Sequence, residues 1–490
     1  MKRLFALAIL IAATLPAASA AAAPPPIRHV WVIQLENTSY AESFGPTSKA
    51  PYFSRDLPAQ GNLLTQFYGI THFSLGNYIA MLSGQPSNMD TQTDCQRFSS
   101  FNGAGTTPDG AAIGQGCVYP PAVKTLPDQL EAKGLSWRGY MQDMANGPGP
   151  DTCRHPAVDA QDTTQSAKVG DQYAVRHNPF VYFRSIIDNQ ARCDANVVDF
   201  GRLANDLKTT ATTANFNFIT PNLCEDGHDE PTCVDGRPGG LMAADVFLQR
   251  TVPGIMASPA FKADGLILVT FDEAEASGPM ADSSACCNQP SGPNTANPGL
   301  TTPGPGGGRI GAIALSRFVK PGTTSTVPYN HYSFLRSMED LFGIGEHLGF
   351  ANQMGLASFG GDVYTQPDGS TQLPLPGMTP KPPSAPPKQT CTTTRVRGAK
   401  VKRGSLVRAV TVSDPIQGKR IVQVSVAHAA RLTVTVKAKG MSARTLTRNK
   451  RVRACRAYRF TLPAGVQRTG TLRVTARLPS GTERRSARYR

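Results

Sequence analysis

The chain has 490 residues, which is enough for two or three domains with cores of ordinary size. Its net charge of +15 is unevenly distributed: residues 388–490 hold 26 Lys and Arg against two acidic residues, a balance of +24, so the rest of the chain carries −9. Ten cysteines agree with an oxidising compartment, and since no CxxC pair has zinc-site spacing, a structural zinc site is not expected.

The first 20 residues have the pattern of a secretory signal peptide. Lys2 and Arg3 precede an apolar run from Leu4 to Leu15, and Ala18-Ser19-Ala20 resembles a cleavage site. No other apolar run approaches the length of a membrane span. We therefore expect a secreted protein, extracellular or associated with the periplasm or cell wall.

The first strand is predicted at His29–Leu35, which is rich in β-branched and aromatic residues. Glu36 and Asn37 follow it directly. The carboxyl ends of parallel strands are where ligands and metals collect, so this pair is a candidate metal site. An ordinary strand with a polar turn explains the pattern equally well, and Asn37-Thr38-Ser39 also matches a glycosylation acceptor.

A helix is predicted between Ser74 and Gly84, because Leu75, Tyr78, Ile79 and Leu82 recur at helical spacing and Gly84 can end it. Ser74 then lies at the helix N-terminus. It is either the N-cap, its commonest role there, or a nucleophile at a helix end that favours anions.

The middle of the chain alternates helices and strands, which indicates α/β winding. The expected segments are a disulfide-tied loop at 87–119, a helix at 125–134, and strands at 136–141 and 215–220. Leu266–Phe271 is the clearest buried strand, and it ends in Asp272 and Glu273. A further strand at 309–316 and a helix at 334–342, opened by residues 329–333, complete this part.

The C-terminal part differs in composition. Residues 366–388 read as a proline-rich, semi-rigid linker between a catalytic domain at 27–365 and a basic domain at 389–490. Five alternating segments predict a small β-sandwich, namely 406–413, 420–426, 431–437, 456–461 and 471–478. Its charge suggests binding to an anionic cell-wall polymer or membrane surface, although a merely solvated domain fits too. Specific nucleic-acid binding is not expected, since aromatic residues do not interleave with the basic ones.

Cysteine spacing does not determine connectivity. Proximity favours Cys95–Cys117 and Cys153–Cys193, and Cys391 and Cys455 are the natural pair in the C-terminal part. The partners of the remaining four cysteines stay open: Cys224, Cys233, Cys286 and Cys287.

The two strand ends together supply hard oxygen ligands suited to a divalent cation, whose identity the sequence leaves unknown. Such a cation beside Ser74 would lower the pKa of its hydroxyl. His177, His228 and His331 could then stabilise the substrate or protonate the leaving group, although any one of them could be an ordinary histidine.

At this point the residues resemble a known family. Segments 32–45, 72–84, 177–179, 221–229, 270–273 and 331–342 are similar to the secreted bacterial phosphoesterases, which include acid phosphatases and phospholipases C and have an alkaline-phosphatase-like fold. The resemblance covers about Arg28–Leu356 and not the C-terminal domain. It implies a doubly wound, mostly parallel α/β sheet followed here by the all-β domain.

The resemblance also implies roles for single residues. Glu36, Asn37, Asp272 and Glu273 would bind one metal ion, with Ser74, His228 and His331 as catalytic residues and Asn77 and His177 as substrate-binding ones. A second metal held by Asp226, His228 and His331 is an open alternative. Phospholipase C members carry Glu-Asn-Arg-Ser-Phe-Asp after the first strand, whereas this chain has Glu36-Asn37-Thr38-Ser39-Tyr40-Ala41. That departure favours the phosphatase-like branch.

Three functions follow as hypotheses. The first is a secreted, metal-dependent phosphatase acting on phosphate esters through a serine nucleophile. The second is a phospholipase C or another phosphodiesterase of the same family. The third is a catalytically inactive protein that binds polyanions or the cell wall; the retention of Ser74 together with four oxygen ligands argues against it.

Overall fold

The computed structural model describes residues 24–147, 149–229, 232–300 and 304–364, and the backbone of strands between residues 407 and 489. The predicted signal peptide, the proline-rich linker and the Cys391–Cys455 pair lie outside the described residues. The chain divides into two compact units, 1–376 and 377–490.

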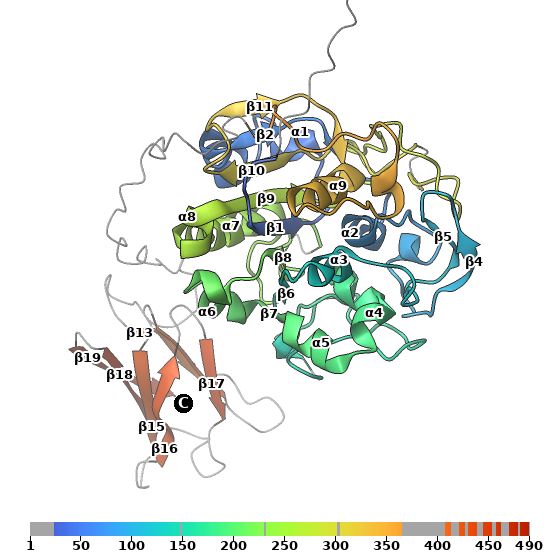
Figure 1. Cartoon of the computed structure of the whole chain (residues 1–490). Coiled ribbons are helices and arrows are strands. Elements are labelled where there is room, and N and C mark those ends of the chain that lie inside the picture. The colour runs from blue at the N-terminus through green and yellow to red at the C-terminus, as the bar shows by residue number, and fades with distance from the viewer. Residues whose placement is uncertain are drawn as a thin grey trace, which may run out of the picture. The chain divides into compact units, whose positions relative to one another are not determined.

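The first unit is built on an eight-stranded mixed sheet (Figure 1). The strand order is β11-β2-β10-β9-β1-β8-β6-β7, and only β10 runs against the other seven in this sheet. The bounds are β1 His29–Leu35, β2 Asn62–Leu64, β6 Trp137–Met141, β7 Val197–Asp199, β8 Phe216–Thr220, β9 Gly265–Phe271, β10 Ala312–Ser316 and β11 Thr323–Ser325. The expected mostly parallel α/β sheet is confirmed.

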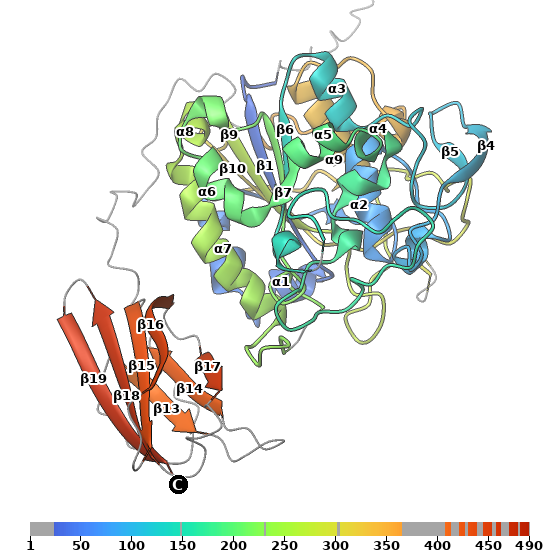
Figure 2. The ribbon, with the colours of Figure 1, turned by 90° about the horizontal axis from the view of Figure 1, so that it is seen from below.

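Two short pairs lie outside this sheet, β3 Phe67–Tyr68 with β12 Tyr329–Asn330 and β4 Asn102–Thr106 with β5 Ala112–Gln115. Helices cover both faces of the main sheet, with α7 and α8 on one side and α2, α3 and α9 on the other (Figure 2). The helix bounds are α1 Tyr40–Ser43, α2 Ser74–Ser83, α3 Leu126–Ala132, α4 Arg184–Ile187, α5 Gln190–Asn196, α6 Leu203–Asp206, α7 Gly240–Ala257, α8 Pro259–Asp264 and α9 His331–Leu341.

The central strands explain why the sheet forms where it does. Every residue of β1, β8, β9 and β10 is buried, as expected for strands covered on both faces. β1 pairs in parallel with β9, in a register that sets Leu35 opposite Phe271. The residues that follow these two strands therefore emerge side by side at the carboxyl edge of the sheet.

The helix that opens at Ser74 is equally well explained. All ten residues of α2 are buried, and Gly84 ends the helix with φ +65°, a left-handed conformation that glycine adopts without a Cβ penalty. α9 begins at His331, three residues before the predicted start, because the Asn330 side chain accepts a hydrogen bond from the Ser333 amide and caps the helix there.

The second unit forms two antiparallel sheets in its described part, ordered β13-β14-β17 and β16-β15-β18-β19. The bounds are β13 Val407–Val412, β14 Ile421–Val426, β15 Ala430–Ala438, β16 Arg444–Val452, β17 Ala457–Thr461, β18 Gly470–Leu478 and β19 Gly481–Tyr489. The sequence prediction missed β16 and β19. These two strands are rich in charged residues, which obscures the alternation of apolar and polar residues.

Four disulfides link cysteines in the described part of the first unit. Cys95–Cys117 and Cys153–Cys193 are present as predicted. The pairs that the sequence left open are Cys224–Cys233 and Cys286–Cys287. None of the helices in the described residues combines the length and the apolar composition that a bilayer span requires.

Candidate active site

The two predicted strand ends meet at the carboxyl edge of the sheet. The Asp272 amide donates to the Leu35 carbonyl at 3.0 Å, and the Thr38 amide donates to the Glu273 carbonyl at 3.1 Å. These two backbone hydrogen bonds place Glu36 and Asn37 beside Asp272 and Glu273. The sequence therefore predicted correctly which acidic residues lie together.

These carboxylates are deeply buried and strongly perturbed. Burial, followed by the charges of Asp272 and Asp229, raises the pKa of Glu36 well above its usual value. Burial, followed by Glu273, raises the pKa of Asp272 in the same way. Within the described part of the chain, Asp272 Oδ2 and Glu273 Oε1 are buried and have no hydrogen-bond partner. Such groups are costly unless a cation or a proton neutralises them.

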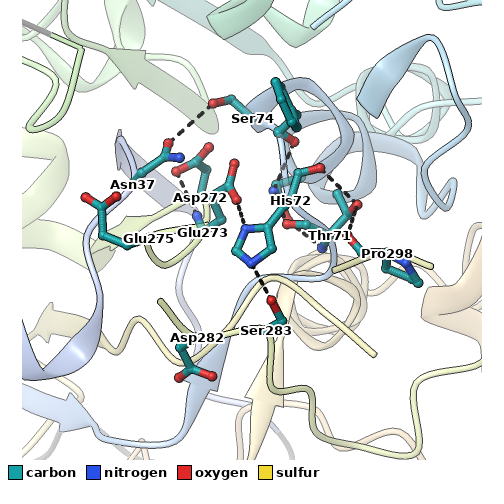
Figure 3. A network of polar contacts seen from close by, with 12 residues as sticks. Asn37, Thr71, His72, Ser74, Asp272, Glu273, Glu275, Asp282, Ser283 and Pro298 are labelled. Carbon is teal, nitrogen blue, oxygen red and sulfur yellow. Dashed lines mark hydrogen bonds and ion pairs between the residues drawn. The ribbon is translucent and has the colours of Figure 1, made fainter. Parts of the chain in front are cut away.

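Ser74 is the first residue of α2 and faces these carboxylates (Figure 3). Its hydroxyl donates to Glu36 Oε2 at 2.7 Å and lies 3.5 Å from Asn37 Oδ1. The residue before it, Phe73, has φ +67°, which is unusual for a bulky side chain. The N-cap position belongs to Phe73, without a side-chain cap, so the Ser74 hydroxyl does not serve the helix end.

Asn77, predicted to bind substrate, contacts the chain's own backbone. Its Oδ1 accepts from the amides of Ile70 and Thr71 at 2.8 and 3.3 Å, and its Nδ2 donates to the carbonyls of Thr71 and Phe73 at 3.0 and 3.4 Å. Asn77 thus fixes the segment that carries Ser74. Its role toward phosphate stays a prediction.

His177 approaches Glu36 from another side. Its ring stacks on Tyr78, with centroids 5.5 Å apart, and its Nε2 lies 3.3 Å from Glu36 Oε1 and 3.7 Å from Asp229 Oδ2. Burial, followed by the charge of Arg176, lowers the pKa of His177 well below its usual value, so the ring is neutral. Arg176 itself donates to Asp229 at 2.7 Å.

The other two predicted histidines differ in placement. His331 is buried at the start of α9, and its Nε2 bonds the backbone carbonyl of Asp272. Because a carbonyl only accepts, Nε2 carries the proton and Nδ1 is an acceptor that lacks a partner among the described residues. Burial lowers the pKa of His331 to about 4. His228 is exposed, with its Nε2 3.9 Å from Glu275 Oε2.

The described residues contain one group of three acidic or histidine side chains able to hold a metal ion, namely Glu36, His177 and Asp229, whose ligand atoms lie within 4.8 Å of one another. They form no such group from Asp226, His228 and His331. The unpaired, buried carboxylate oxygens of Asp272 and Glu273 lie at the same strand ends. Carboxylates with few counter-charges, amide oxygen and neutral imidazole suit a divalent cation.

Sequence reasoning missed several residues of this site. Tyr78, four residues after Ser74, donates to Glu36 Oε1 at 2.5 Å, and its position one helical turn later was the available signal. His72, two residues before Ser74, bonds Glu273. Asp94 accepts from the Leu75 amide at 3.0 Å, and nothing in the sequence signals that a loop residue reaches the helix start.

A cavity of about 370 Å³ lies elsewhere in the first unit, lined by residues 24–28, Lys133, Leu135, Asn215 and residues 341–343. It adjoins the amino end of β1, whereas the candidate site follows the carboxyl end. None of the candidate site residues, such as Glu36, Ser74 or Asp272, lines this cavity, so we do not assign the active site to it.

The chain is similar in sequence to several known proteins. The sequence model of the Phosphoesterase family matches residues 47–345. A Kluyveromyces lactis protein named "Probable acid phosphatase" is 25% identical over 331 residues, covering 66% of this chain and 61% of that protein. A Mycobacterium tuberculosis protein named "Phosphatidylinositol-3-phosphatase" is 24% identical over 325 residues, covering 66% and 80%. The chain thus spans less than two thirds of the Kluyveromyces relative.

Solved structures give a more distant likeness. A crystal structure of a protein in the alkaline phosphatase superfamily from Vibrio parahaemolyticus has a TM-score of 0.35 and 12% identity, covering 66% of this chain and 69% of that one.

Proposed function

Because the chain belongs to the Phosphoesterase family, we propose that it is a secreted, metal-dependent phosphatase that hydrolyses phosphate monoesters with Ser74 as nucleophile. The observation that carries the proposal is the hydrogen bond of 2.7 Å from the Ser74 hydroxyl to Glu36 Oε2. At the same sheet edge, Asp272 and Glu273 each have a buried carboxylate oxygen without a partner in the described part of the chain. The four disulfides of the described residues support an oxidising compartment outside the cell.

We assign the divalent cation to Glu36, Asn37, Asp272 and Glu273, as the family resemblance implied, with His177 and Asp229 close enough to Glu36 to contribute. When bound, the cation would polarise the phosphoryl oxygens and favour the alkoxide form of a nearby hydroxyl. The fit rests on the donor chemistry and on the buried carboxylate oxygens that lack partners in the described residues.

Ser74 would attack phosphorus while its proton passes to Glu36 Oε2, which accepts the hydrogen bond of the hydroxyl. The Oγ–P bond forms, the ester P–O bond breaks, and the leaving alkoxide takes a proton from His228. Water then attacks the phosphoserine and returns a proton to His228, the Oγ–P bond breaks, and Ser74 recovers its proton from Glu36 as phosphate is released. The N-terminus of α2 favours the anionic phosphoryl group through its dipole, although the Leu75 amide is already bonded to Asp94.

The histidines are given different tasks. We assign protonation of the leaving group to His228, which is the exposed histidine of the three. His331 and His177 are buried and neutral, so we assign them to positioning rather than to proton donation. The Nε2 proton of His331 is already donated to the Asp272 carbonyl.

A monoester is favoured over a diester because the relatives described above are named as phosphatases. A phospholipase C-like activity is the second candidate. Binding of anionic polymers by the basic C-terminal domain is a separate prediction, on which the described side chains have no bearing.

The test is hydrolysis of p-nitrophenyl phosphate and of bis(p-nitrophenyl) phosphate by the full chain, with and without chelator. Monoester turnover should be lost on chelation and restored by a divalent cation. Ser74→Ala should lower kcat by several orders of magnitude, whereas Ser83→Ala, in the same buried helix, should leave it unchanged. Turnover of the diester alone would establish the second candidate, and full activity of Ser74→Ala would refute the proposed nucleophile.

A further inference from the structure

His72 joins the candidate metal site to the long loop after β9. Its ring is wholly buried, with Nδ1 bonded to Glu273 Oε2 and Nε2 2.9 Å from the Ser283 hydroxyl. Figure 3 shows the ring between these two side chains. A carboxylate accepts, so Nδ1 carries the proton, and Nε2 then accepts from Ser283.

Glu273 is a side chain that needs such a partner. It has three rotatable bonds, is fully buried, and uses one carboxylate oxygen for His72. Its other oxygen, Oε1, has no partner in the part of the chain that the structure describes. Holding Oε2 fixes where Oε1 points, and Oε1 is the atom available to a cation.

The backbone of His72 is also held in place. The His72 amide donates to the Pro298 carbonyl at 2.8 Å, and the Thr71 hydroxyl donates to the same carbonyl at 3.1 Å. Gln92 Nε2 donates to the Thr71 hydroxyl at 3.1 Å. These hydrogen bonds therefore connect the segment that leads into Ser74 with the loop around residue 298.

We propose that His72 is a positioning residue: it orients Glu273 so that Oε1 can bind the divalent cation, and it does so through its Nδ1 contact rather than through packing. This role rests on the proposed function, since it presupposes that Glu273 binds metal. Partners of metal ligands that act in this way typically change metal affinity 10–100-fold when they are removed.

Two substitutions separate the two ring nitrogens. In His72→Asn the side-chain amide nitrogen takes roughly the place of Nδ1 and can still donate to Glu273. In His72→Gln it reaches roughly the place of Nε2, beside Ser283 and away from Glu273. Gln keeps one methylene group more than Asn and is closer to His in volume. A role in packing therefore predicts the larger loss in His72→Asn, whereas positioning through Nδ1 predicts the larger loss in His72→Gln.

The measurement is the dissociation constant for Mg²⁺, Mn²⁺ and Ca²⁺, obtained by calorimetry on the chelator-treated full chain, with the melting temperature in chelator as a check of folding. His72→Asn should stay within about threefold of the wild type, His72→Gln should bind about 10–100-fold more weakly, and Ser283→Ala should resemble His72→Asn. A larger loss in His72→Asn, an equal loss in both variants, or unchanged affinity in both would overturn the positioning role of His72 and leave the proposed metal-dependent function standing. A wild-type protein that binds none of these cations would overturn the metal-dependent function itself.

Discussion

Tyr78 and Tyr182 offer a direct comparison of two buried phenols. Both rings are almost fully buried. The Tyr78 hydroxyl donates to Glu36 Oε1 at 2.5 Å, and burial, followed by the Glu36 charge, raises the pKa of Tyr78 well above its usual value, so the phenol stays a donor. The Tyr182 hydroxyl has no partner among the described residues. Replacing each by Phe removes a hydroxyl oxygen in both cases, but in Tyr78 that hydroxyl donates a hydrogen bond and in Tyr182 it has no partner among the described residues.

The two substitutions should change the free energy of unfolding differently. Tyr78→Phe takes a donor from a buried carboxyl group and should lower it by about 1–3 kcal/mol. Tyr182→Phe removes a buried hydroxyl that has no partner among the described residues and should raise it by about 1 kcal/mol or leave it unchanged. For a unit of about 340 residues the unfolding entropy is roughly 0.7 kcal/mol/K, so a difference of 3 kcal/mol corresponds to about 4 °C between the two variants.

The assays are thermal unfolding in chelator and steady-state hydrolysis of p-nitrophenyl phosphate with added cation. Tyr78→Phe should melt below the wild type and lower kcat/KM at least tenfold, because Glu36 loses the bond that orients it beside Ser74. Tyr182→Phe should melt at or above the wild type with unchanged kcat/KM. Equal melting temperatures and equal activities in the two variants would refute the account of how Glu36 is held.

Three further outcomes are expected. Burial raises the pKa of Glu339 to about 8, so the folded state binds this proton more tightly than the unfolded state, and stability falls as pH rises from about 4.5 through 8. Glu339→Gln should therefore raise the free energy of unfolding by on the order of 4 kcal/mol at pH 9 and change it little at pH 4. Equal shifts in melting temperature at both pH values would contradict this. A Cβ at Gly254 would meet nothing within 4 Å, so Gly254→Ala should stabilise α7 by about 0.5–1 kcal/mol. A Cβ at Gly76 would lie 2.6 Å from Thr71 Cγ2, so Gly76→Ala should lower both stability and activity. Denaturant unfolding that shows the same direction of stability change in both variants would be the contrary result. A divalent cation at 100 times its dissociation constant should raise the free energy of unfolding by about 2.7 kcal/mol in the wild type and by far less in Glu273→Gln. Scanning calorimetry that shows no cation-dependent shift of the melting temperature in the wild type would refute the metal site.

The five central strands of the main sheet could be predicted from their apolar and β-branched runs, namely β10, β9, β1, β8 and β6. β2, β7 and β11 were missed, because three residues are too few to show a pattern. The same reasoning pointed to the candidate site. Glu36 and Asp272 each follow such a run, and parallel pairing of β1 with β9 makes their meeting unavoidable. α7 was not predicted, since it contains a proline at position 253 and glycine near both ends. Strand periodicity is a local property, and it is strong here.

The atoms that each side chain contacts could not be predicted in the same way. Asn77 has the spacing of a ligand-binding residue, yet its amide bonds the backbone of residues 70–73. His228 and His177 look alike in the sequence, but one is exposed and the other stacks on Tyr78. Which hydrogen bonds form depends on long-range contacts, such as the one between His72 and the loop around Pro298, and these leave no local pattern in the sequence.

The central claim is that phosphate is transferred first to Ser74 and only then to water. The stereochemical course of hydrolysis, followed with a phosphate monoester made chiral at phosphorus by oxygen isotopes and sulfur, tests it most directly. Two successive in-line displacements, one by Ser74 and one by water, predict overall retention of configuration in the wild type. Inversion would mean that water attacks the ester directly, and it would contradict the role assigned to Ser74.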